Sequence, residues 1–297
     1  MSCMDRTLRI WNNRPRLEIA RLSHNSQVIG LAWLDGDAAV MTFCEDGVLG
    51  NWTRIGQQNQ WQWGRVLSVD AEERAPGDDV CLTCARDRIA IAFPKTGVKV
   101  WMWSKGSWRA QRSITRTNVT ALKFIDDGDA LLGGTRDGVL WHCAVPNGTM
   151  KVYAFLKSIT SIATNPPRMQ ALVTQANGLA CLVKLGSQAE RRVGQSFSEP
   201  DLRDGALGAV FAADGKTVVF GNVDDCLLVW DALKGAVLYG MEHPDGDMIQ
   251  TVASCDGPDG GVVAGTQQGR LLWWPEPQPP VQSPSNSNSS RKRPKVK

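Results

Sequence analysis

The sequence has little of what marks a metalloenzyme, a membrane protein or a secreted protein. Only three of its 297 residues are histidine, too few for a multi-histidine metal site. The first six residues, MSCMDR, lack the apolar core of a secretory signal. No apolar run approaches the roughly 18 residues that span a membrane. Eight cysteines in so long a chain do not suggest a disulfide framework. We therefore expect free thiols and no membrane partner.

Motifs of catalysis and metal binding are also missing. The sequence contains no nucleophile elbow, Walker loop, zinc-protease helix or EF-hand loop. Cys81 and Cys84 have zinc-like spacing, and His142 and Cys143 resemble a base and a nucleophile. Residues one or three apart on a strand face opposite sides, so neither pair converges. We predict a protein that is not an enzyme and needs no cofactor or metal.

Glycine and tryptophan are abundant instead, at 29 and 12 residues, whereas charged residues make up only 21%. This composition is typical of many short strands joined by tight turns. A strand, a polar turn and a second strand recur along the chain. The turns lie at Asp5-Arg6, Asp46-Gly47, Thr96-Gly97, Asp137-Gly138, Asn177-Gly178, Asp224-Asp225 and Gln268-Gly269. Their spacing of 40 to 50 residues matches the roughly 40–45 residues of a four-stranded propeller blade.

The strand after each turn is apolar, and most copies alternate with period two, as strands with two different faces do. These strands are expected near 7–11, 48–54, 98–103, 139–144, 179–185, 227–231 and 270–274. In four copies a tryptophan lies six residues after the first turn residue. These are Trp11, Trp52, Trp230 and Trp274.

The segments from Asp5 to Trp11 and from Asp224 to Asp231 resemble the repeats of the WD-repeat family. That family also places a histidine before the innermost strand of a blade, and His24 and His243 occupy such positions. The resemblance covers about residues 4–275. It implies an all-β propeller of four-stranded antiparallel blades over residues 1–275. It says little about function, because this fold serves many roles.

The resemblance further implies a hydrogen-bonded set of side chains inside a blade. One blade holds every member of this set: His24, Thr42, Asp46 and Trp52. The last blade has His243, Thr266 and Trp274, but Gln268 stands where aspartate is expected. We interpret these residues as structural, because a buried polar set that satisfies its own donors and acceptors fixes the packing of a blade.

The ring can close in two ways, because the chain begins with a third strand and ends without a fourth. In the favoured seven-fold closure, strands 7–11 and 16–22 form an incomplete first blade. In the alternative, six blades close and strand 7–11 is surplus, with strand 16–22 completing the last blade. We also expect that about 30 residues, most of a repeat, precede Met1 in the full protein. Unfilled strand edges would otherwise cause poor solubility or attract a partner that fills them.

Residues 276–297 differ sharply from the rest and are predicted to be a disordered tail rich in proline and serine. The tail ends in a basic run that resembles a nuclear import signal. Its residues are Arg291, Lys292, Arg293, Pro294, Lys295 and Lys297. Ser283 precedes a proline and is a candidate phosphorylation site, where a phosphate would oppose this positive charge. We predict an importin partner and a nuclear location, with the cytoplasm as the alternative.

Two pairs of tryptophans are spaced for one face of a strand: Trp61 with Trp63, and Trp101 with Trp103. Buried between blades they are ordinary packing, and exposed they could anchor a partner. We interpret them as packing.

The predicted function is a scaffold that holds other proteins in a nuclear complex through the loop faces of a propeller. A chromatin- or RNA-associated binding module is the alternative, with any contact to nucleic acid indirect. It is suggested by the tail and by Arg6, Arg9, Arg14, Arg16 and Arg21. A propeller enzyme is the third reading, for which no converging acid, base or metal residues are seen.

Overall fold

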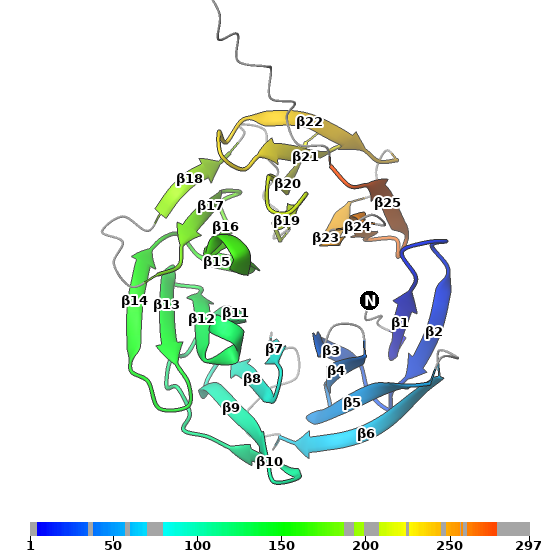
Figure 1. The fold of residues 1–297 in the computed structure, drawn as a ribbon, viewed down its shortest axis with the longest axis vertical. Helices are drawn as coiled ribbons and strands as arrows, with labels where there is room; N and C mark the ends of the chain where they lie inside the picture. The colour runs from blue at the N-terminus through cyan, green and yellow to red at the C-terminus, as the bar shows by residue number, and fades with distance from the viewer. Residues whose placement is uncertain are drawn as a thin grey trace, which may run out of the picture.

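The fold is a ring of antiparallel β-sheets (Figure 1). The computed structural model describes residues 5–34, 38–56, 60–69, 80–186, 193–198, 208–223, 226–244, 248–255, 257 and 260–277. Six sheets follow one another along the chain, five of four strands and one of three. No helix among these residues is long and apolar enough to span a membrane.

Each of the six blades begins with an inner strand and continues outward. The inner strands are β3 (Val28–Leu34), β7 (Cys81–Ala85), β11 (Val119–Ile125), β15 (Ile159–Asn165), β19 (Val210–Ala212) and β23 (Ile249–Cys255). The second strands are β4 (Ala39–Cys44), β8 (Arg88–Phe93), β12 (Ala130–Thr135), β16 (Gln170–Gln175), β20 (Thr217–Val223) and β24 (Gly261–Thr266). The third strands are β5 (Val48–Ile55), β9 (Gly97–Ser104), β13 (Val139–Ala144), β17 (Ala180–Lys184), β21 (Cys226–Asp231) and β25 (Leu271–Pro275).

The outer strands complete five of the blades. They are β6 (Gln60–Ser68), β10 (Ser107–Ala110), β14 (Met150–Phe155), β18 (Val193–Phe197) and β22 (Val237–Glu242). Single turns of 3-10 helix, Asp126–Gly128 and Pro166–Arg168, connect the first two strands of two blades. A strand follows each of the seven turns, and its bounds differ from the expected ones by at most one residue.

The N-terminal strands form a separate sheet. Strands β1 (Thr7–Trp11) and β2 (Glu18–Ser23) pair with each other, and they lie between the β23–β25 blade and the β3–β6 blade (Figure 1). The arrangement combines the two predicted closures. The six blades of the alternative closure are present, and the extra N-terminal strand pairs with β2 at a further position in the ring. In the described part of the chain, β25 pairs only with β24.

Glycine in the turn between the second and third strands permits close packing. Gly47 and Gly138 have φ angles of +82° and +84°, a region that other residues enter at a cost. A Cβ at Gly47 would collide with the carbonyl oxygen of Val69, and one at Gly138 with that of Leu156. The outer strand can therefore pass directly beside the turn, which explains the recurrent Asp-Gly.

The core lies between neighbouring blades, because each blade buries both of its faces. Leu132 and Leu140 pack with Val173 and Val183 of the next blade, for example. The same alternation places Leu8 and Ile10 of β1 against Val40 of β4. The N-terminal sheet is therefore docked on the first complete blade.

Candidate functional site

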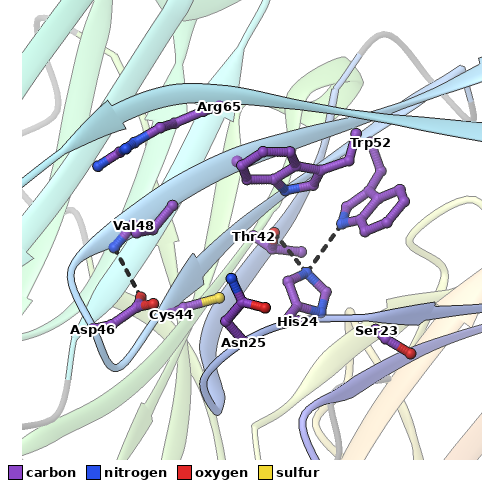
Figure 2. Close-up of a pocket in the computed structure, with 11 residues that line it drawn as sticks. Ser23, His24, Asn25, Thr42, Cys44, Asp46, Val48, Trp52 and Arg65 are labelled. Atoms are coloured by element: carbon purple, nitrogen blue, oxygen red, sulfur yellow. Dashed lines mark hydrogen bonds between the residues drawn. The ribbon is translucent and has the colours of Figure 1, made fainter.

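The predicted blade motif forms around His24, in the loop between β2 and β3 (Figure 2). The indole N–H of Trp52 donates a hydrogen bond to Nε2 of His24 at 3.0 Å. The Thr42 hydroxyl lies 3.1 Å from the same nitrogen. The two rings meet edge to face, with centroids 5.6 Å apart. The imidazole thus joins the end of the N-terminal sheet to β4 and β5.

These contacts determine the protonation state of His24. Because Nε2 accepts from Trp52, its lone pair is used and the proton lies on Nδ1. Burial lowers the pKa of His24, an effect that the carbonyl groups of Arg6 and Leu22 partly oppose. Nδ1 is itself buried, and no acceptor among the described residues meets it in hydrogen-bonding geometry. The ring is therefore neutral at neutral pH and has a structural role.

Asp46 lies beside these three residues, but its hydrogen bond is to the backbone. Its carboxylate accepts a hydrogen bond from the backbone N–H of Val48 at 3.1 Å and so stabilises the turn from β4 to β5 (Figure 2). Three of the four predicted residues therefore bond to one another, and the aspartate bonds to the backbone. The reason is local, because a short acidic side chain before glycine reaches the amide two residues ahead.

A cavity of about 340 Å³ opens beside His24 and is also lined by Asp46, Trp63 and Arg65 (Figure 2). Two of its polar side chains are engaged within the protein. The guanidinium of Arg65 donates to the hydroxyl of Ser68, and Asp46 holds the turn. We interpret the cavity as space beside a structural motif.

The other predicted motif residues form different contacts. Asp5 accepts from the backbone N–H of Thr7 at 3.1 Å and pairs with Arg9 at 2.7 Å. Trp11 has a buried indole nitrogen that meets no acceptor among the described residues. Trp230 is buried and donates to the carbonyl of Phe220 at 2.8 Å.

In the last blade the motif residues make contacts that differ from those around His24. Trp274 donates to the backbone carbonyl of Glu242 at 3.1 Å, next to His243 in sequence. His243 Nδ1 lies 3.3 Å from the carbonyl of Pro244. Thr266 accepts from the backbone N–H of Arg270, and so serves the turn. Asp224, Ser283 and residues 291–297 lie outside the described residues.

The cysteines are free thiols wherever the structure describes them. Cys81 packs toward the β11–β14 blade and Cys84 toward the β3–β6 blade, so the two sulfurs face opposite sides as predicted. Burial raises the pKa of Cys84 to about 12, which keeps it protonated. Cys143 is buried, while His142 stacks on Tyr153 with ring centroids 5.2 Å apart. The two members of each pair therefore lie in different surroundings.

A groove lined by tryptophan opens at the rim between two blades. It has a volume of about 660 Å³ and runs between β6 and the β9–β10 hairpin. Its lining includes Trp101, Trp103, Trp108, Arg65 and Asn51. Trp103 and Trp108 meet edge to face with ring centroids 5.4 Å apart. We call this surface the tryptophan groove.

Exposure within the tryptophan groove is uneven. Trp101 and Trp108 pack against the neighbouring blade, whereas 46% of Trp103 is exposed. The first pair behaves similarly, because Trp61 packs under the N-terminal sheet while Trp63 is exposed. The predicted packing role is thus correct for one member of each pair. Period-two spacing predicts that the two tryptophans of a pair lie on the same face of a strand. It does not predict how much of that face the neighbouring blade covers.

The structure is similar to the crystal structure of the Cps50 (Swd1) β-propeller domain of Myceliophteria thermophila. The TM-score is 0.70 and the sequence identity 16%, over 92% of this chain and 91% of that one. No family model matches the sequence. At this identity the similarity establishes the fold. The similarity shows that this chain folds as a β-propeller, and the bonded set of His24, Thr42 and Trp52 is part of the set that the resemblance to WD repeats implies.

Proposed function

We propose that this protein is a non-catalytic scaffold that binds other proteins, and that it does so through the tryptophan groove. The observation that carries the proposal is Trp103, a large aromatic side chain left 46% exposed at the mouth of a groove. Tryptophan and arginine dominate the energetics of protein interfaces, especially within pockets that exclude water. The groove supplies both residue types together.

A polar group in the groove supports a protein ligand. The side-chain oxygen of Asn51 is buried and has no hydrogen-bond partner among the described residues. Buried acceptors are rarely left unsatisfied. In the proposed complex the Asn51 side chain rotates to present this oxygen to a donor of the partner, such as a backbone N–H, while the partner's apolar side chains contact Trp103 and Trp108.

We further propose that the scaffold works in the nucleus. The support is the sequence of the tail, where Arg291 to Lys297 holds five basic residues of the kind that an importin recognises by charge. Within residues 1–274, acidic residues outnumber basic ones by one, so the positive charge that an importin would read is concentrated in the tail.

Binding to nucleic acid has less support as the main role. Two of the N-terminal arginines are already paired, Arg9 with Asp5 and Arg21 with Glu18. Ion-paired arginines offer less charge to a phosphate backbone. We therefore place any contact with chromatin or RNA in the partners of the scaffold.

Affinity purification of the tagged full-length chain, followed by mass spectrometry, tests this proposal. We expect a reproducible set of co-purified nuclear proteins, of which one or more is lost with Trp103→Ala. Phe155→Ala is the matched control, because Phe155 is an aromatic residue 79% exposed on another outer strand. An unchanged set of proteins with Trp103→Ala would contradict the role of the groove.

A further inference from the structure

The walls of the tryptophan groove, β6 and the β9–β10 hairpin, lie next to each other at the rim (Figure 1). Among the described residues that line the groove, Arg65 is the one charged side chain. Residues 47–69 and 88–125, which contain both walls, hold ten lysines and arginines and no aspartate or glutamate. In the rest of residues 1–274, acidic residues outnumber basic ones. Positive charge is therefore concentrated in the part of the ring that forms the groove.

Arg65 has no acidic partner among the described residues. Its guanidinium donates hydrogen bonds to the hydroxyl of Ser68, and no salt bridge joins it to the described part of the chain. Asp46 lines the cavity beside His24 together with Arg65, but its carboxylate accepts from the backbone of its own turn. A guanidinium forms its strongest hydrogen bonds with carboxylates and phosphates. Arg65 is therefore available to an anionic group of a partner.

Two lysines extend the positive charge along the groove. Lys105 lies in the turn of the β9–β10 hairpin, next to the lining residue Gly106. Lys99 lies on the same face of β9 as Trp101 and Trp103, because side chains two residues apart along a strand share a face. The face of β9 that lines the groove therefore has a positive charge near each of its ends.

We infer that the tryptophan groove takes an acidic segment of a partner protein, in which carboxylates flank a large apolar side chain. The inference rests on the proposed function of the groove and adds the chemistry of its ligand. The apolar side chain packs against the exposed ring of Trp103, and the carboxylates pair with Arg65 and Lys105. Complementary charges of this kind determine which partners bind and speed their association.

The same features argue against two other ligands. Aromatic cages bind quaternary ammonium groups, but the cations of this groove would repel such a ligand. Single-stranded nucleic acid stacks successive bases on aromatic side chains. Trp101 and Trp108 are half-buried, and Trp108 meets Trp103 edge to face. The groove thus presents one open ring instead of a row, which favours a protein segment with a single anchor.

Fluorescence anisotropy of a labelled peptide, titrated with the full chain, tests this inference. The probe is the peptide GSEEDFEEDGS, whose acidic residues flank a phenylalanine. We expect saturable binding that weakens as the salt concentration rises, because ions screen exposed charges. Two control peptides should bind at least about tenfold more weakly. They are GSKKKFKKKGS, which reverses the charge, and GSEEDAEEDGS, which lacks the anchor.

Variants of the full chain assign the binding to the groove. Arg65→Gln removes the charge and should weaken binding of the acidic peptide about tenfold, whereas Arg65→Lys keeps the charge and should weaken it less. Trp103→Ala removes the ring and should also weaken it. Lys151→Gln is the matched control, because Lys151 is an exposed cation on the outer strand β14. Unfolding curves confirm that each variant remains folded.

Three results would overturn the inference. The first is equal binding of the acidic and the basic peptide. The second is equal affinity of Arg65→Gln and the original protein for the acidic peptide. The third is tighter binding of a single-stranded oligouridylate than of the acidic peptide, with loss of that binding in Trp103→Ala. This third result would identify nucleic acid as the ligand of the groove.

Affinity purification distinguishes failure of this inference from failure of the proposed function. We expect Arg65→Gln to lose the same partners as Trp103→Ala. Loss of partners with Trp103→Ala alone would leave the groove as a protein-binding site and contradict an acidic ligand. Loss of partners with neither variant would contradict the proposed function itself.

Discussion

The indole N–H of Trp52 and Nε2 of His24 lie 3.0 Å apart and form a hydrogen bond that joins the third strand of the first complete blade to the loop behind the N-terminal sheet. The backbone N–H of His24 also donates to the carbonyl of Arg6 at 2.9 Å. His24 therefore bonds to the N-terminal sheet through its backbone and to the first complete blade through its side chain. A two-stranded sheet is marginal by itself, so its stability depends on this docking.

Replacing Trp52 by phenylalanine should lower the free energy of unfolding by about 1–2 kcal/mol, because a partly buried acceptor on His24 loses its donor. Denaturant unfolding at pH 7.5 measures the change. Trp63→Phe is the control, since the exposed Trp63 lies in the same cavity outside this hydrogen-bonded set. Equal losses for the two variants would show that the bond contributes nothing specific.

Stability should fall as the pH drops below about 6.5, the ordinary pKa of histidine. Burial lowers the pKa of His24 in the folded protein. Between the two pKa values the unfolded chain therefore binds a proton that the folded chain does not, which favours unfolding. Above pH 6.5 both states are neutral and the effect vanishes.

The variant His24→Gln isolates this effect. The loss of unfolding free energy between pH 7.5 and pH 5.5 should be smaller in the variant than in the original protein. A loss of the same size in both would mean that His24 is not responsible for the pH dependence.

Gly138→Ala should be more costly than Gly106→Ala. Both glycines have positive φ, +84° and +78°, so each variant incurs about 1 kcal/mol of backbone strain. A methyl group at Gly138 also collides with the carbonyl of Leu156, whereas one at Gly106 meets nothing within 4 Å. We expect a total of about 2–4 kcal/mol for Gly138→Ala. Thermal unfolding compares the two, and equal costs would refute close packing against the turn.

Deletion of residues 291–297 should move a fluorescently tagged protein from the nucleus to the cytoplasm without changing its melting temperature. The basic run supplies the charge that an importin would recognise, and its lysine and arginine side chains offer little apolar surface to a core. Ser283→Asp should weaken nuclear entry in the same assay by opposing that charge. Undiminished nuclear signal in the deletion would contradict the import signal.

The sequence predicts the ring well because the repeat is periodic. The Asp46-Gly47 and Asp137-Gly138 turns recur where a blade needs a tight connection, and alternation in the following strand identifies its two faces. The bond between Trp52 and His24 follows from the family resemblance. All of these features are local, or repeat at a fixed spacing.

The tryptophan groove could not be predicted in this way, because exposure depends on what a neighbouring blade covers. Trp101 and Trp103 are equivalent by spacing, yet of the two only Trp101 packs against the preceding blade. The partner of Asp46 was also missed, since a nearby backbone N–H competes with the histidine for its carboxylate. Side-chain exposure and the choice of hydrogen-bond partner depend on distances in the folded protein, which the period of the sequence does not encode.

The most direct test of the scaffold function is the affinity of the purified chain for a co-purified partner, measured by calorimetry. Trp103→Ala should weaken this affinity at least about tenfold, as truncation of an interface anchor does, and Phe155→Ala should leave it unchanged. Equal affinity of Trp103→Ala and the original protein would contradict binding through the tryptophan groove.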